Sequence, residues 1–406
     1  MKVICETGNY PDGQKICVAK IVYDAPVDPF SIDLDTYEVE NRTIDGFSVD
    51  ENTVILDLNI RDAAASLIPG PGPRKPGGPG GPGGPGGPGG PGGPKHDGPP
   101  LNMPPTVRRP AEIKVRQKGC IRDINGNEIA GDDSFVLSSE TYEPVVEQFR
   151  QFEHKGIGYN LYIPENPNGE KLPLVYFLHD AGPCGDDVKI TLSQGNGAIT
   201  WAKPEWQKKH PCYVLAPQIP RSVHLTNDKF KASEEIYILK EIIDLVADTY
   251  DVDKNRIYAT GQSMGCMSAC EMNILWPDFF AASMLVAGQW DPERMGAKCA
   301  DCKFWILVSN HDAKAFPGMN AVTEALAAGG AKVKRYLWNA KSTPEQFDAL
   351  VASALTDDVN VRYTVFQGDT VIPDWKDPNP GANHVSTWPV AYEIEGVKEW
   401  LFSNSK

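Results

Sequence analysis

Residues 261–265 read Gly-Gln-Ser-Met-Gly, a G-x-S-x-G pattern centred on Ser263. Residues 256–260 before it are rich in strand-forming side chains, and residues 266–276 after it can continue as a helix. A strand, a tight turn flanked by glycines and a helix form the context in which a serine hydroxyl is exposed for nucleophilic attack. The pattern therefore predicts covalent catalysis by Ser263.

A serine nucleophile needs a base, and the base needs an acid that orients it. In this strand–turn–helix context the acid follows the serine along the chain and the histidine comes last. Of the seven histidines, only His311 and His384 follow Ser263. We place His384 in a loop after the last strand and Asp312 directly after the strand expected at 304–309. The predicted triad is Ser263, Asp312 and His384.

The acid has rivals, because other carboxylates follow the serine along the chain. Asp369 and Asp374 could also orient His384, and His384 itself could be an ordinary surface histidine. We prefer Asp312 because it comes at the end of the penultimate strand. His311 is expected to line the same loop without a catalytic role.

The tetrahedral intermediate of acyl transfer needs N–H donors for its oxyanion. One donor should be Met264, the residue after the nucleophile. The second should come from the loop after the strand at 172–179, where the N–H of Ala181 follows a sharp turn. The alternative is that this loop only connects a strand to a helix.

From about residue 150 onward, strand-like and helix-like segments alternate, which predicts a mostly parallel sheet flanked by helices. The strand at 172–179 is continuously apolar, as strands buried on both faces are. Besides those already given, the expected strands are 156–164, 212–217, 282–288 and 361–366, and the expected helices are 234–250, 318–328 and 343–354.

Residues 1–143 have a different pattern, with short β-rich runs at 15–23, 53–60 and 111–117 separated by turn formers. This pattern predicts an antiparallel β-sandwich. Within it, residues 69–105 contain a Pro-Gly-Gly repeat with almost no side chains to bury, which predicts a disordered insertion. A collagen-like trimer is the alternative, since glycine recurs at every third position. Residues 144–406 form the second expected domain.

Several segments resemble α/β-hydrolase carboxylesterases of the polyhydroxybutyrate depolymerase and feruloyl esterase group. They are 251–265, 178–182, 276–281, and His384 with the Ser-Thr-Trp at 386–388. With a β-sandwich in front, the chain resembles bacterial esterases that carry an N-terminal immunoglobulin-like domain. The resemblance implies an α/β-hydrolase fold and ester hydrolysis through an acyl-enzyme, with no metal and no organic cofactor.

Two residues depart from the pattern of that group. The group usually has glycine where this chain has Asp180, and a carboxylate near a developing oxyanion is unfavourable unless it is paired or points away. The group also tends to have glycine where this chain has Cys266. We expect the second departure to leave the fold intact.

The substrate stays open at this point. It could be a small or aromatic ester, a feruloyl or acetyl ester on a plant polysaccharide, or a polyester. A serine peptidase and an inactive binding module are alternatives of other classes. The β domain could shape the mouth of the active site or form a homo-oligomer.

Composition excludes some partners. The 406-residue chain has a net charge of −15 and no basic block, so nucleic acid is not an expected partner. No apolar run is long enough to span a membrane, and no signal peptide is visible. We expect a cytoplasmic protein, or a secreted one whose signal was removed. The nine cysteines suit free thiols, and the pair Cys299 and Cys302 suits loop thiols or a disulfide within the loop.

Overall fold

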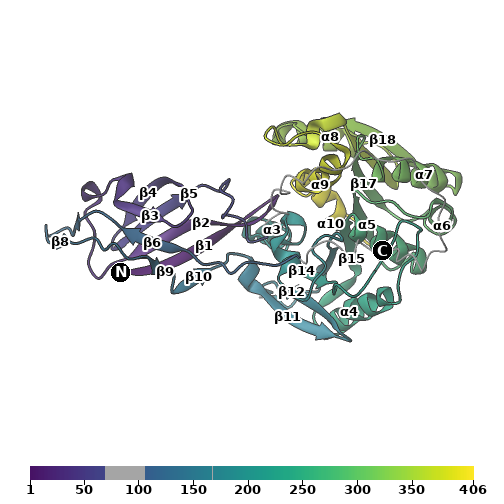
Figure 1. Ribbon diagram of the computed structural model, residues 1–406. Helices are drawn as coiled ribbons and strands as arrows, with labels where there is room; N and C mark the ends of the chain where they lie inside the picture. The colour runs from purple at the N-terminus through teal and green to yellow at the C-terminus, as the bar shows by residue number, and fades with distance from the viewer. Residues whose placement is uncertain (69–105, 167) are drawn as a thin grey trace, which may run out of the picture.

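The computed structural model describes residues 1–68, 106–166 and 168–406. The predicted Pro/Gly-rich insertion at 69–105 therefore lies outside the described residues. Figure 1 shows a β-rich part formed by the N-terminal residues beside a larger part in which helices surround a sheet.

The N-terminal part is all-β within the described residues, with sheets ordered β10-β1-β2-β5-β4, β3-β6-β9 and β7-β8. Side chains from all three sheets, such as Val3, Val115 and Ile121, share one apolar core. The strands are β1 (Lys2–Tyr10), β2 (Gly13–Val22), β3 (Tyr37–Val39), β4 (Ile44–Asp50), β5 (Thr53–Leu58), β6 (Lys114–Gln117), β7 (Ile121–Arg122), β8 (Glu128–Ile129), β9 (Val136–Leu137) and β10 (Glu140–Tyr142).

The second part contains a nine-stranded sheet among the described residues, ordered β11-β12-β14-β13-β15-β16-β17-β19-β18. Strand β12 is antiparallel to both of its neighbours, and the strands from β14 to β18 are parallel. The strands are β11 (Phe149–His154), β12 (Ile157–Tyr162), β13 (Leu172–Leu178), β14 (Tyr213–Gln218), β15 (Val252–Gln262), β16 (Ala282–Val286), β17 (Phe304–Ser309), β18 (Val333–Trp338) and β19 (Val361–Phe366).

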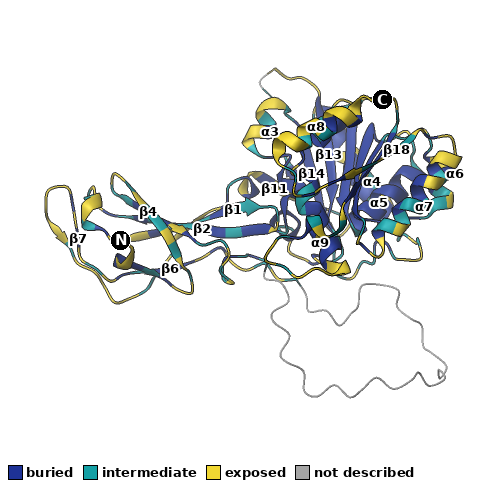
Figure 2. Ribbon diagram, turned by 90° about the horizontal axis from the view of Figure 1, so that it is seen from above, coloured by how far each residue is buried: buried dark blue, intermediate teal, exposed yellow. Residues whose placement is uncertain are grey.

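Helices cover both faces of this sheet (Figures 1 and 2). Buried apolar side chains form one core on each side. Alternate residues of β13 show this arrangement, because Tyr176 belongs to one core and Phe177 to the other. The helices are α1 (Ile190–Ser193), α2 (Asn196–Ile199), α3 (Pro204–Lys209), α4 (Glu235–Thr249), α5 (Met264–Leu275), α6 (Pro292–Lys298), α7 (Ala315–Ala328), α8 (Pro344–Leu355), α9 (Pro380–Ala391) and α10 (Glu395–Phe402).

The expected mostly parallel sheet with flanking helices is present, but one local expectation is wrong. His384 does not lie in a loop, because residues 380–391 form the helix α9. Asn379 caps this helix by accepting from the N–H of Ala382, and Pro380 occupies its first turn. The helix also contains Pro389, which lies near its C-terminal end.

The β1–β2 hairpin of the N-terminal part reaches the second part (Figure 2). At its tip, Gly13 has a φ of +128°, and a Cβ there would lie 3.2 Å from the carbonyl oxygen of Ser193. The next residue, Gln14, accepts a hydrogen bond of 2.7 Å from the Ser193 hydroxyl. The two parts therefore meet through close backbone contact and buried polar groups. Within the described residues, none of the helices has the length and apolar character needed to cross a bilayer.

Lys398 in α10 gives the fold a testable pH dependence. Its ammonium is buried, donates to the Thr200 hydroxyl at 2.9 Å, and has a pKa lowered by burial to about 8. An unfolded lysine titrates near ~10.4. Between these values the unfolded chain binds more protons than the folded one, so this lysine makes the free energy of unfolding rise with pH from about 8 to about 10.

We expect Lys398→Met to remove that rise, measured by denaturant unfolding across this pH range. Lys298→Met, a change at an exposed position in α6, is the control and should leave it in place. Identical slopes in wild type and Lys398→Met would contradict the prediction.

Candidate active site

Ser263 occupies the single residue between β15 and α5, with a φ of 50° and a ψ of −114°. A positive φ is costly for a residue with a side chain and persists only where the surroundings enforce it. Here the Ser263 N–H donates to the carbonyl of Val286 and its own carbonyl accepts from the N–H of Met267, both at 3.0 Å. These bonds hold the chain in a sharp turn that exposes the serine side chain.

The two glycines of the motif permit close backbone packing at this turn. A Cβ on Gly265 would lie 2.0 Å from the carbonyl oxygen of Leu178, and one on Gly261 would lie 2.5 Å from the carbonyl carbon of Gly265. No larger residue fits without moving the end of β13. The Cys266 side chain has room because it faces Gly288. A Cβ on Gly288 would lie only 2.6 Å from the Cys266 sulfur.

The structure brings Ser263, His384 and Asp312 together. His384 Nε2 lies 2.9 Å from Ser263 Oγ, and His384 Nδ1 lies 2.5 Å from Asp312 Oδ2. A neutral imidazole satisfies both contacts when Nδ1–H donates to the carboxylate and Nε2 accepts from the hydroxyl. This tautomer leaves His384 ready to take the serine proton.

Asp312 is built to remain ionised. Only 3% of it is exposed, and this burial opposes the charged form. The hydrogen bond and charge of His384, together with the N–H groups of Ala315 at 2.9 Å and Lys314 at 3.0 Å, outweigh burial and lower the pKa of Asp312. The carboxylate can therefore orient His384 and stabilise its protonated form.

The rival acids have other partners. Asp369 accepts from His311 Nδ1 at 3.0 Å and from the amide of Asn383 at 2.8 Å, while Asp374 forms an exposed ion pair with Lys341. His311 is half exposed. Neither acid contacts His384, so the geometry leaves Asp312 as the residue that can orient it.

Sequence reasoning missed a supporting residue beside the histidine. Asn383 in α9 is buried, and its side-chain oxygen accepts from the Ser309 hydroxyl at 2.8 Å. This bond ties the helix that carries His384 to the end of β17, just before Asp312. The position of Ser309 at the carboxyl end of a strand was the signal that could have found it.

The loop after β13 lies beside the serine turn, because Gly265 packs against the carbonyl groups of both Leu178 and His179. Met264 begins α5, so its N–H has no acceptor within the helix and is free for an oxyanion. Ala181, the other sequence-predicted donor, lies in the loop. The two candidate donors thus come from segments that pack against each other.

His179 fixes the direction of the Ala181 N–H. Its Nε2 lies 2.9 Å from the N–H of Ile219, and its Nδ1 lies 2.6 Å from the Asp180 carbonyl oxygen. Only the tautomer protonated on Nδ1 satisfies both, and burial lowers the pKa of His179, which favours the neutral ring. In a trans peptide the C=O and N–H point opposite ways, so holding the Asp180 carbonyl holds the Ala181 N–H.

Asp180, which departs from the resembling group, is paired. Its Oδ1 accepts from the N–H of Gly182 and its Oδ2 accepts from the amide of Gln262, both at 2.9 Å. Two donors thus occupy the carboxylate, one of them from the residue preceding the nucleophile. The charge is therefore paired within the protein.

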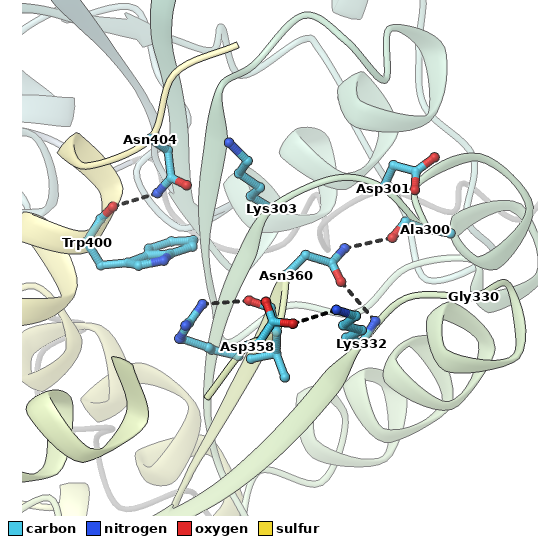
Figure 3. Close-up of a pocket in the computed structure, with 11 residues that line it drawn as sticks. Ala300, Asp301, Lys303, Gly330, Lys332, Asp358, Asn360, Trp400 and Asn404 are labelled. Atoms are coloured by element: carbon cyan, nitrogen blue, oxygen red, sulfur yellow. Dashed lines mark hydrogen bonds and ion pairs between the residues drawn. The ribbon is translucent and has the colours of Figure 1, made fainter. Parts of the chain in front are cut away.

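A separate cavity of about 370 Å³ lies away from these residues (Figure 3). Lys303, Lys332 and Asn360 line it, and each directly precedes a strand, so the cavity lies at the amino ends of β17, β18 and β19. Ser263 and Asp312 follow the carboxyl ends of their strands. The cavity therefore opens at the edge of the sheet opposite to the triad, and its lining includes no serine, threonine or cysteine.

Within the described ranges, no group of three His, Cys, Asp or Glu side chains is placed to hold a metal ion. All nine cysteines fall in those ranges and are free thiols, so no disulfide joins Cys299 to Cys302.

Comparison with known proteins supports the fold. No protein-family model matches the sequence, and no curated protein matches it. Among solved structures, a thermostable esterase matches with a TM-score of 0.77 and 24% identity over 100% of both chains. The second part of the chain has an α/β-hydrolase fold.

Other solved structures match less well. A ferulic acid esterase matches with a TM-score of 0.41 and 13% identity, over 63% of this chain and 97% of its own. An acylaminoacyl peptidase from Pyrococcus horikoshii matches with a TM-score of 0.37 and 12% identity, over 63% and 40%.

The pairing of His384 with Asp312 can be tested by Asp312→Asn, which keeps the size of the side chain and removes its charge. We expect the rate of reaction with p-nitrophenyl acetate to fall by ~10³- to 10⁴-fold, because an amide no longer secures the productive tautomer. Asp369→Asn is the matched control and should retain most of the rate. A large loss in Asp369→Asn with little change in Asp312→Asn would reverse the assignment.

Proposed function

We propose that the protein is a serine carboxylesterase that hydrolyses small or aromatic carboxylic esters through an acyl-enzyme on Ser263. The observation that carries the proposal is the contact of 2.9 Å between His384 Nε2 and Ser263 Oγ, with Asp312 on the opposite ring nitrogen. A serine hydroxyl becomes a nucleophile when a positioned base takes its proton. The full-length neighbour with a TM-score of 0.77 is named an esterase, which supports an ester as the substrate.

In acylation, Ser263 Oγ attacks the carbonyl carbon of the ester while His384 Nε2 accepts the serine proton. The carbonyl oxygen becomes an oxyanion that accepts hydrogen bonds from the N–H groups of Met264 and Ala181. The intermediate collapses, the C–O bond to the alcohol breaks, and His384 returns the proton to the departing alcohol. Asp312 stabilises the protonated ring between these transfers.

In deacylation, a water molecule takes the place of the alcohol. His384 accepts a proton from the water, the resulting hydroxide attacks the acyl carbon, and the carboxylic acid leaves as Ser263 recovers its proton. Apart from the substrate and water, each step uses groups of this chain alone. The proposal therefore includes no metal and no organic cofactor.

Within this reaction, feruloyl or acetyl esters of plant polysaccharides and polyesters are the alternative substrates. A serine peptidase would use the same residues, but an amide has a poorer leaving group and needs more binding energy in the transition state. An inactive binding module is disfavoured by the preorganised contacts of Ser263. Activity toward esters compared with matched amides separates these functions.

We also propose a domain boundary near residues 143 and 144. The apolar core of the N-terminal part takes its residues from Val3 to Ile121, and the cores of the α/β-hydrolase part take theirs from Val145 onward. An immunoglobulin-like identity for residues 1–143, self-association through them, and a cytoplasmic or secreted location remain proposals of the sequence analysis.

The function can be tested with purified protein and p-nitrophenyl acetate or butyrate. We expect turnover by the wild type and a loss of ~10⁴- to 10⁶-fold in Ser263→Ala, because the nucleophile is removed. Ser353→Ala, at an exposed position of α8, is the matched control and should keep full activity. No turnover by the wild type, or equal turnover in Ser263→Ala, would refute the esterase. Faster cleavage of matched p-nitroanilides than of the esters would identify a peptidase.

A further inference from the structure

The loop that carries Ala181 receives a hydrogen bond from the N-terminal part of the chain. The hydroxyl of Thr106 donates to the carbonyl oxygen of Gly182 at 2.8 Å. A Cβ on Gly185 would also lie 3.8 Å from the Thr106 carbonyl oxygen, so the backbone of Thr106 packs against this loop. A residue 76 positions earlier in the sequence therefore contacts the segment that we assign to the oxyanion hole.

Thr106 is held in place by Arg108, two residues later. Arg108 Nε donates to the Ser193 hydroxyl at 2.8 Å, and its guanidinium forms an ion pair with Glu143, which also pairs with Lys189 at 3.2 Å. The side chains of Arg108 and Glu143 are only 10% and 9% exposed. Charges buried to this extent need their partners, because separating them would leave an uncompensated charge. The network thus anchors the segment that contains Thr106.

The contact acts on a glycine of the loop. Gly182 has no Cβ, so its backbone can take many conformations unless other groups restrain it. Its N–H donates to Asp180 Oδ1 at 2.9 Å, and its carbonyl accepts from Thr106. Ala181 therefore lies between two restrained neighbours. His179 holds the carbonyl of Asp180, and both the N–H and the carbonyl of Gly182 are hydrogen-bonded.

We propose that Thr106 is a positioning residue of the oxyanion hole, through which the N-terminal β part sets the orientation of the Ala181 N–H. This inference rests on the proposed esterase function. The N–H is needed most when negative charge develops on the substrate oxygen. Loss of the Thr106 bond therefore lowers kcat and weakens the binding of a transition-state analogue, while KM changes little.

The test is Thr106→Val, which replaces the hydroxyl by a methyl group of similar size. We expect kcat for p-nitrophenyl butyrate to fall about three- to tenfold, the value of one ordinary hydrogen bond, with KM within about twofold. The inhibition constant of a trifluoromethyl ketone, which forms an oxyanion on the serine, should rise by the same factor as kcat falls. Thr106→Ser keeps the hydroxyl and should restore both values.

The matched control is Thr141→Val. Thr141 makes the same kind of bond, from its hydroxyl to the carbonyl of Ala111 at 2.6 Å, but within the N-terminal part. It should change neither kcat nor the inhibition constant. If Thr106→Val does not fold, Thr106→Ala, which also lacks the hydroxyl, takes its place and should show the same loss.

The role of Thr106 would be overturned if the variant without the hydroxyl kept the wild-type kcat and inhibition constant. It would also be overturned if Thr141→Val lost as much kcat as that variant. Failure of the proposed function looks different. In that case the wild type itself would not turn over the ester, or its turnover would survive Ser263→Ala.

Discussion

The backbone of Ser263 must pass from strand to helix within one residue, at a φ of 50°. This turn requires glycines at 261 and 265, because any Cβ there would collide with backbone atoms. The same close approach presses the start of α5 against the end of β13. One backbone constraint therefore exposes the nucleophile and packs together the two segments that carry its candidate oxyanion donors.

The parallel sheet supplies the rest of the arrangement. Strands that run in the same direction end at the same edge, so the residues that follow them meet there although they are far apart in sequence. Asp312 follows β17, and His384 arrives on α9 after β19. The cavity in Figure 3 lies at the opposite edge, which explains why its lysines and asparagine take no part in the proposed reaction.

The sequence was sufficient for the features that depend on local pattern or chain order. The turn at Ser263, its flanking strand and helix, and the alternation of strands and helices follow from short-range spacing. His384 followed from its place after the serine. The helix α9 around His384 was missed, although Asn379 as its cap and Pro380 in its first turn are local signals for a helix start.

Features that depend on contacts between distant segments could not be predicted from local sequence patterns. Chain order favoured Asp312 over Asp369, but the contact that supports this choice, His384 with Asp312 and His311 with Asp369, appears only in the structure. Similarly, the pairing of Asp180 with Gln262 and the contact of Thr106 with Gly182 join segments that no local pattern connects. In each case tertiary packing decides which of several chemically similar groups meet.

Covalent labelling tests the central claim most directly, because it asks whether Ser263 is the activated nucleophile. The protein would be treated with diethyl p-nitrophenyl phosphate, digested and sequenced by mass spectrometry. We predict one diethylphosphoryl group per chain, located on Ser263, with release of p-nitrophenolate. Labelling at another residue, or no labelling of folded protein, would contradict the account.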